Sequence, residues 1–303
     1  MNHLFLVLLS SAKIAVICSL GSFNFLNSAR LQKDDWVKKL SSKMQDGMQN
    51  LSTKNSARRS STPKDLIDII EQGHIPKNER KYIINGWRWH TMSVMRDLDR
   101  FSSVLTKLST QTEDISLEDR KRLHSCYEFV CNFNWRALMK VEREIFFPWL
   151  SDLLPSSAKP LMNDIIAQHS TIVNKAAEIG SICTLISTDN IEPQQVRASV
   201  HSIDAILKDL IHCAQKIRNA QEDIFVPYIA AYCNKQQQTV FNNRVISQLG
   251  LLDSQVHIVS MFEAIKDDKD EMILFKEEIP RVARGLIPIW KSRLYDPKTR
   301  ALY

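Results

Sequence analysis

Two short stretches of the sequence share one pattern. Residues 141–148 read VEREIFFP and residues 220–227 read AQEDIFVP, each an acidic turn that leads into an aromatic residue and then proline. The separation between Pro148 and Pro227 equals that between His90 and His169, which precede them. A fixed separation of this kind is typical of an internal repeat. The sequence therefore predicts two related helix pairs.

The composition indicates an all-α protein. The chain has 303 residues, of which 44% are apolar, so it can bury a substantial core in one or two domains. Only 7 residues are glycine and 10 are proline, whereas leucine, isoleucine, alanine and long polar residues run in stretches with helical spacing. Because glycine and proline punctuate turns, their scarcity favours long helices.

The charge pattern gives no support for a nucleic-acid-binding protein. The 40 basic and 34 acidic residues leave a formal charge of +6, and they are spread along the chain without a long basic block. Nucleic-acid-binding domains usually carry clustered basic residues. We therefore expect no nucleic-acid partner.

The first helix pair has one apolar face on each helix. In the first helix the residues of this face recur at three- and four-residue steps and include a histidine: His90, Val94, Leu98, Phe101, Leu105 and Leu108. The second helix is expected to begin near Ser116, with Asp119 as an imperfect capping box. Its buried face comprises Cys131, Leu138, Glu142 and Ile145. A carboxylate therefore points inward.

The second helix pair repeats this arrangement. The third helix presents Ile165, His169, Ile172 or Val173, and Ala176, and the fourth presents Ile203, Leu210, Ile217, Gln221 and Ile224. The polar members of the four faces can lie in one layer. After each aromatic–proline step the chain should leave the helix or kink, because proline lacks a backbone donor and crowds the preceding turn.

Four long helices with short connections predict an antiparallel, up-down four-helix bundle, which we assign to residues 64–235. Residues 236–303 are expected to form a C-terminal helical extension that packs on the bundle as a cap. Its two helices are predicted at Ser247–Lys266 and Lys269–Leu294. His257 lies in this extension, outside the bundle, and is not a candidate site residue.

The last of these predicted helices interleaves basic and apolar residues, and Pro280 and Pro288 break or kink it. The residues concerned are Arg281, Arg284, Lys291 and Arg293, with Leu286, Ile289 and Trp290 between them. Such a pattern fits either a solvated outer face or a basic amphipathic surface for a partner or anionic lipid. The solvated face is the simpler interpretation. Membrane contact is expected only from the N-terminal segment, and the sequence leaves a protein partner and the oligomeric state open.

At these residues the sequence resembles the hemerythrin-like (HHE cation-binding) family, over about Trp87 to Tyr232. The resemblance implies a bundle that holds two iron atoms. In that family the first and third helices each give a histidine, and the second and fourth each give His-x-x-x-Glu before a short aromatic–proline ending. The four-residue spacing puts an imidazole and a carboxylate on one helical face, so both reach the same metal pair.

Three of the six expected ligands are present. The resemblance places His90 at the first-helix histidine, Glu142 at the second-helix carboxylate and His169 at the third-helix histidine. These residues are the candidate metal ligands.

The other three ligand positions have changed. Leu138 and Ile217 stand where the histidines of the second and fourth helices are expected, and Gln221 replaces the second bridging carboxylate. A neutral amide is a weak ligand that supplies no charge to neutralise iron. The two branched aliphatic side chains would fill the space that a second metal needs. The pattern therefore disfavours a di-iron centre and indicates a degenerate site, most simply without a cofactor.

The surviving polar residues allow three interpretations. His90 and His169 can be buried histidines that hydrogen-bond Glu142, which satisfies three groups that are costly to bury unpaired. Alternatively, His90, Glu142, His169 and water can hold a single Fe, Zn or Mn ion. Finally, Glu222 can substitute for Gln221, but a one-residue shift turns the side chain about 100° around the helix.

The sequence favours a non-enzymatic scaffold or interaction module that keeps the bundle without its metal chemistry. The alternative is a metal-binding or sensing protein, for iron or oxygen, that uses a reduced mononuclear site. We find no nucleophile motif, glycine-rich phosphate loop or CxxC site, so the sequence does not predict an enzyme.

The N-terminal region has two parts. Residues 1–21 contain two apolar runs separated by a break at Lys13, which resembles a signal or targeting segment although a charged n-region is missing. This segment favours the secretory pathway or an organelle over the cytoplasm. Residues 22–63 are rich in serine, asparagine, lysine and arginine and are interpreted as a flexible linker.

The cysteines do not settle the compartment. The chain has 6 cysteines and no CxxC pair, and five of them lie in or beside helical patterns: Cys126, Cys131, Cys183, Cys213 and Cys233. A chain of this length can build a core without disulfides, so we expect free thiols.

Overall fold

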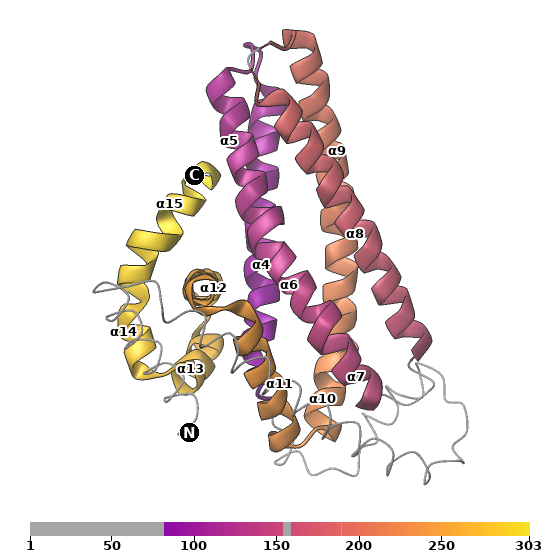
Figure 1. The fold of residues 1–303 in the computed structure, drawn as a ribbon, viewed down its shortest axis with the longest axis vertical. Helices are drawn as coiled ribbons and strands as arrows, with labels where there is room; N and C mark the ends of the chain where they lie inside the picture. Colours follow the sequence, from indigo (N-terminus) through magenta and orange to yellow (C-terminus); the bar gives the residue numbers. More distant parts are fainter. Residues whose placement is uncertain (1–81, 154–158, 189) are drawn as a thin grey trace, which may run out of the picture. The chain divides into compact units, whose positions relative to one another are not determined.

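A computed structural model of the chain describes residues 82–153, 159–188 and 190–303 (Figure 1). Within these ranges all regular structure is helical and no strand occurs, which confirms the predicted all-α class. The predictions of a targeting segment at residues 1–21 and of a linker at residues 22–63 lie outside the described residues.

Four long helical rods pack against one another. Rod 1 is α4 (Asn85–Thr110). Rod 2 runs through α5 (Leu117–Tyr127), η2 (Glu128–Trp135), α6 (Arg136–Val141), η3 (Glu142–Phe146) and α7 (Phe147–Leu153). Rod 3 is α8 (Lys159–Ile186), and rod 4 comprises α9 (Pro193–Ala220), η5 (Gln221–Phe225) and α10 (Val226–Tyr232). Rod 1 contacts rods 2 and 4, and rod 3 also contacts rods 2 and 4 (Figure 1).

The apolar faces predicted for the first helix pair are buried. The six residues expected on the inner face of α4, from His90 to Leu108, are all buried. Rod 2 begins as predicted, because Ser116 caps α5 by accepting a 3.1 Å hydrogen bond from the Asp119 backbone N–H. Cys131, Glu142 and their apolar neighbours on the predicted face are also buried.

The two aromatic–proline steps do not end their helices. Just before each proline the backbone forms a wide π turn, in which the Phe147 N–H bonds the Glu142 carbonyl and the Val226 N–H bonds the Gln221 carbonyl. The helix then continues as α7 or α10. Proline cannot donate to the helical ladder, and the wide turn accommodates its ring without a break. The two π turns start at equivalent positions of the sequence repeat, Glu142 and Gln221, so the repeat is also present in the backbone structure.

The C-terminal region contains more and shorter helices than the two predicted. They are α11 (Lys235–Leu249), α12 (Leu251–Ile265), α13 (Lys269–Glu278), α14 (Arg281–Trp290), η6 (Lys291–Tyr295), α15 (Asp296–Thr299) and η7 (Arg300–Leu302). The predicted start at Ser247 is wrong. Asn234 and Gln237 form a capping box that starts α11 earlier, and Gly250, at φ +73°, separates α11 from α12.

These helices pack on rod 1 through α12 and on rod 2 through α11. Helix α12 contacts α4 on one side and α14 and η6 on the other (Figure 1). The final turn, η7, returns to contact α4 and α5. In the described part of the chain, none of the helices combines the length and apolar character needed to cross a membrane.

Candidate functional site

Glu142 lies at the centre of a group of buried polar side chains that we name the carboxylate cluster: Trp87, Glu142, His169 and Gln221. One carboxylate oxygen, Oε1, accepts hydrogen bonds from Trp87 Nε1 at 3.1 Å and from Gln221 Nε2 at 2.7 Å. The other, Oε2, lies 2.9 Å from His169 Nε2. The structure therefore places a single buried carboxylate beside two hydrogen-bond donors and one imidazole.

Each rod contributes one member of the carboxylate cluster. Trp87 comes from α4, Glu142 from η3, His169 from α8 and Gln221 from η5. Glu142 and Gln221 each begin a π turn, and the sequence repeat brings these two equivalent positions into direct contact. The Trp87 ring stacks on Phe146 at 4.2 Å, which orients its N–H toward the carboxylate.

His169 is close to the carboxylate but poorly aligned with it. Its Nε2 is buried and makes no hydrogen bond of normal geometry, despite the 2.9 Å separation from Glu142 Oε2. The ring packs edge-on against Phe147, with 4.9 Å between the ring centroids. The nitrogen therefore keeps unused hydrogen-bonding or ligating capacity.

A small cavity of about 20 Å³ lies beside the carboxylate cluster. Glu142, His169 and Gln221 line it, and so do the buried side chains of Leu138 and Ile217. A space of this size holds about one water molecule. The two aliphatic residues thus face the interior at the positions where the family pattern expects imidazoles.

His90 does not join the carboxylate cluster. Although it is buried as predicted, its Nε2 lies 3.0 Å from Asn134 Oδ1. The hydrogen bond expected between His90 and Glu142 is not formed, so that part of the sequence interpretation is wrong. The reason is that Asn134, on rod 2, offers a buried acceptor to this imidazole.

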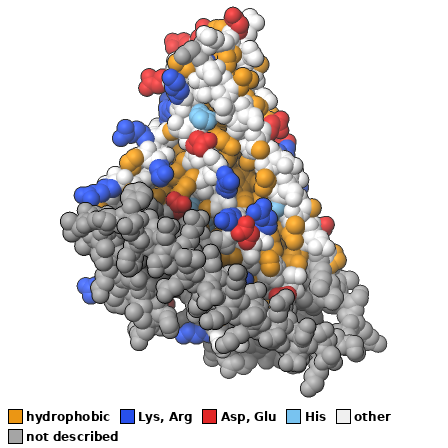
Figure 2. Space-filling view, viewed as in Figure 1, with side chains coloured by type: hydrophobic (Ala, Val, Ile, Leu, Met, Phe, Trp, Pro, Cys, Tyr) orange, Lys and Arg blue, Asp and Glu red, His pale blue; other side chains and the backbone are white. Residues whose placement is uncertain are grey.

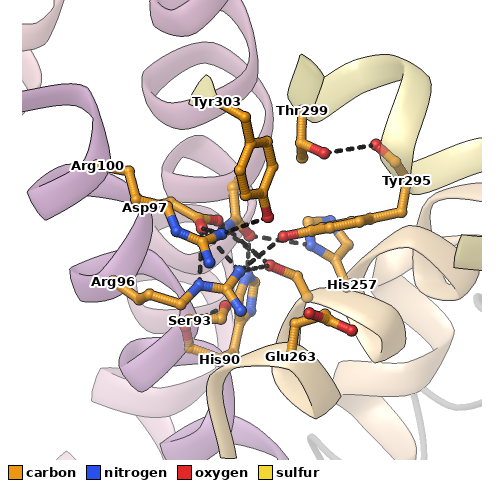
Figure 3. A network of polar contacts seen from close by, with 12 residues as sticks. His90, Ser93, Arg96, Asp97, Arg100, His257, Glu263, Tyr295, Thr299 and Tyr303 are labelled. Atoms are coloured by element: carbon orange, nitrogen blue, oxygen red, sulfur yellow. Dashed lines mark hydrogen bonds and ion pairs between the residues drawn. The ribbon is translucent and has the colours of Figure 1, made fainter. Parts of the chain in front are cut away.

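His90 belongs to a second buried group, which we name the asparagine network: His90, Arg96, Asp97, Asn134, His257, Ser260 and Tyr295 (Figure 3). Asn134 Nδ2 donates to Asp97 Oδ2 at 2.8 Å. Its Oδ1 therefore faces the two histidines, His90 Nε2 at 3.0 Å and His257 Nδ1 at 3.3 Å. Because this oxygen only accepts, both imidazoles must carry a proton on the nitrogen that faces it.

Asp97 joins the asparagine network to the C-terminal helices. Its carboxylate has no solvent exposure and accepts hydrogen bonds from Arg96 Nη2 at 2.7 Å and from Ser260 Oγ at 3.3 Å. Arg96 Nη2 also donates to the Tyr295 hydroxyl at 2.8 Å (Figure 3). Burial raises the pKa of Asp97, and the Arg96 guanidinium opposes that shift. Burial also raises the pKa of Tyr295.

The two histidines of the asparagine network are in ring contact and neutral. Their centroids are 4.7 Å apart, and Phe133 stacks on the His257 ring at 4.7 Å. Burial lowers the pKa of His90 to about 4. Burial, with a smaller contribution from His90, lowers the pKa of His257 well below its usual value. Both imidazoles are therefore uncharged at neutral pH.

Sequence reasoning missed His257 because it treated the C-terminal region as separate from the rods. The available signal was weak: His257 and Ser260 lie three residues apart in a strongly apolar stretch, on one face of α12. Both are almost fully buried. A pair of polar residues on an apolar helical face indicates a buried hydrogen-bonding partner elsewhere in the chain.

The described residues contain no group of three or more histidine, cysteine, aspartate or glutamate side chains placed to hold a metal ion. His169 and Glu142 are together, whereas His90 lies in the other network. The carboxylate cluster thus offers one imidazole and one carboxylate beside a space for one water molecule. Comparison of the chain with family models, curated proteins and solved structures finds no match.

Proposed function

We propose that this chain is a hemerythrin-like, antiparallel up-down four-helix bundle that acts as a non-enzymatic scaffold or interaction module. Its di-iron site is degenerate, and protein side chains hold the remaining bridging carboxylate. The packing of four rods, each of which gives one residue to a central polar cluster, supports this proposal. In bundles of this class, cofactor sites form where inward side chains of facing helices meet at one level.

The repeat gives the bundle topology independent support. Rods 2 and 4 carry π turns at equivalent positions, and each turn begins at the residue that the family pattern assigns to a bridging carboxylate. Single π turns inside α-helices occur often at functional sites. Their retention in both halves favours descent from a protein with two symmetric carboxylates.

One observation carries the scaffold proposal: Glu142 Oε1 is already engaged by Trp87 Nε1 and Gln221 Nε2. In a di-iron site that oxygen would bind metal. Leu138 and Ile217 occupy the neighbouring ligand positions, and burying each contributes about 1.5–3 kcal/mol to folding. The residues at the centre of the bundle therefore stabilise the fold and leave fewer ligands for a cation.

Metal analysis of the purified full chain tests this proposal. After expression in iron-supplemented medium, mass spectrometry should find no stoichiometric iron, and the absorption spectrum should lack an oxo-bridge charge-transfer band. A variant with Leu138→His, Ile217→His and Gln221→Glu restores three family ligands and serves as the positive comparison. Stoichiometric iron in the natural chain would refute the scaffold proposal.

A single-metal function is the second candidate, and His169 is the observation that favours it. Its buried Nε2 lacks an aligned hydrogen bond, lies 2.9 Å from Glu142 Oε2 and lines a cavity with room for one water. An imidazole, a carboxylate and water suit Zn, Fe or Mn. His90 is not part of this set, so the reduced site has one protein ligand fewer than the sequence predicts.

Two histidine variants distinguish this candidate from the scaffold. If one equivalent of metal copurifies with the chain, His169→Ala should abolish it, whereas His90→Ala should leave it in place. His201→Ala, at an exposed position on rod 4, is the matched control. Metal loss in all three variants, or in none of them, would contradict a site at His169.

A further inference from the structure

Almost all of the net charge of the chain resides in its C-terminal segment. Arg281–Tyr303 contains six basic residues and one acidic residue, a formal charge of +5, whereas the rest of the chain is nearly balanced at 34 basic and 33 acidic. On the face shown in Figure 2, basic and acidic side chains are intermixed over the rods. The C-terminal helices therefore carry a local excess of positive charge.

These helices have a buried side and an exposed side. Helix α14, η6 and α15 follow one another without a break from Arg281 to Thr299. Their inner side buries Ala283, Ile287 and Tyr295 and packs against α12. The opposite side carries two exposed aliphatic residues, Val282 at 58% and Ile289 at 47% exposure.

Exposed cations border these aliphatic residues. Val282 and Ile289 are seven residues apart and lie on the same side of α14. We use the name outer face for these two residues and the exposed basic residues Arg281, Arg293 and Arg300. Lys298 is not included, because its ammonium lies over the Phe133 ring of rod 2. Among the described residues, Arg281, Arg293 and Arg300 form no ion pair, unlike Lys291, which contacts Glu263 and Asp296. The three guanidinium groups are thus available to an external anion.

We propose that the outer face binds the surface of an anionic lipid membrane. Aliphatic side chains flanked by cations are typical of a helix that lies in the interface plane, where the apolar groups enter the headgroup boundary and the cations meet lipid phosphates. The anionic membrane surface attracts these cations, and each basic residue near the surface raises the affinity about fivefold. This departs from our sequence-based expectation that membrane contact is limited to the N-terminal segment.

The aliphatic residues favour lipid over nucleic acid. Val282 and Ile289 gain by entering the headgroup boundary, whereas the phosphate backbone of a nucleic acid offers them no partner. The proposal does not depend on the carboxylate cluster, because none of its residues belongs to the outer face.

Vesicle sedimentation with the full chain tests the proposal. Vesicles of phosphatidylcholine alone are compared with an equal mixture of phosphatidylcholine and phosphatidylserine. The chain should bind the mixed vesicles more strongly, and added salt should weaken that binding. The double variant Arg293→Glu and Arg300→Glu should bind at least about tenfold less well. The variant Val282→Ser and Ile289→Ser should also lose binding while its charge is unchanged.

A control variant of matched charge isolates the outer face. Arg136→Glu with Arg143→Glu changes two exposed arginines of rod 2 and alters the net charge equally, yet should retain vesicle binding. All variants keep residues 1–21, so any contribution of that segment is common to them, and circular dichroism checks that each is folded. Equal loss in the control and the outer-face variants would overturn the proposal. So would absence of binding to mixed vesicles, or stronger binding to duplex DNA that is insensitive to the serine variant.

Discussion

The carboxylate cluster and the asparagine network are both buried and polar, and each leaves one buried nitrogen without a hydrogen bond, His169 Nε2 in the first and Arg96 Nη1 in the second. They differ in what lies beside that nitrogen and in how the other groups are paired. In the carboxylate cluster, His169 Nε2 lacks an aligned partner and a cavity of about 20 Å³ lies alongside. In the asparagine network, Asn134 and Asp97 each use both side-chain polar atoms in hydrogen bonds. The first has space for about one water molecule beside its carboxylate, whereas the second joins rods 1 and 2 to the C-terminal helices.

In the described part of the chain the asparagine network occurs once, and the sequence repeat indicates why. The positions one repeat length after Asp97 and Asn134 hold Ala176 and Cys213, which cannot reproduce the hydrogen bonds. Helix α12 packs on α4, the first helix of the first pair, and supplies His257 and Ser260 to that side alone. The differences between the two helix pairs at these positions therefore coincide with the side on which α12 packs.

The largest effect is expected at Asp97. An Asp97→Ala variant leaves Arg96 and Asn134 without their buried acceptor, and breaking a buried pair of this kind costs about 3–5 kcal/mol. Urea unfolding should show this loss, and limited proteolysis should cleave the C-terminal helices sooner. The exposed Asp99→Ala on the same helix is the control and should change stability by less than about 0.5 kcal/mol. If Asp97→Ala and Asp99→Ala lowered the unfolding free energy equally, the asparagine network would contribute no more to stability than an exposed side chain does.

Acid should weaken the asparagine network. The folded protein holds the pKa of His90 at about 4, below the ordinary value of 6.5, so the unfolded chain binds more protons between these pH values. Stability should fall as pH decreases from 6.5 to 4, by on the order of 3 kcal/mol for this group. The raised pKa of Asp97 acts in the opposite direction. Unfolding free energies measured across this range give the total slope.

A His90→Gln variant isolates the histidine contribution, because an amide can still donate to Asn134 but does not titrate. Its stability should depend less steeply on pH between 6.5 and 4 than that of the natural chain. Identical slopes would mean that His90 is not held neutral by burial.

A smaller effect is expected in the carboxylate cluster. Glu142→Gln keeps the shape and an acceptor oxygen for Trp87 but removes the charge, so we expect a loss of about 1–2 kcal/mol in urea unfolding. The exposed Glu144→Gln in the same turn is the control and should be nearly neutral. If Glu142→Gln lost as much unfolding free energy as Asp97→Ala, the carboxylate cluster and the asparagine network would stabilise the fold equally, contrary to this prediction.

Much of the fold could be predicted from the sequence because it rests on periodicity and repetition. The apolar face of α4, the cap at Ser116 and the inward position of Glu142 all follow from helical spacing. The π turns could not be predicted, because proline alone indicates a break and only the packed neighbours decide how the backbone accommodates it. The helix boundary at Gly250 was missed because glycine is tolerated within helical patterns.

The candidate site was predictable in part for the same reason. The meeting of Glu142, His169 and Gln221 follows from their places in the repeat. The partner of His90 does not, because it depends on an asparagine that lies eight residues before Glu142 and on a helix far along the chain. Contacts between elements distant in sequence leave no periodic signal in either element.

The central claim is that the carboxylate cluster is held by protein side chains without a cation. Thermal unfolding of the full chain before and after treatment with a metal chelator tests it most directly. A site saturated at a hundredfold excess over its dissociation constant contributes about 2.7 kcal/mol, which corresponds to roughly 4–5 °C in a chain of this size. The account predicts a midpoint unchanged within about 1 °C. A fall of several degrees that is reversed by added iron, zinc or manganese would contradict it.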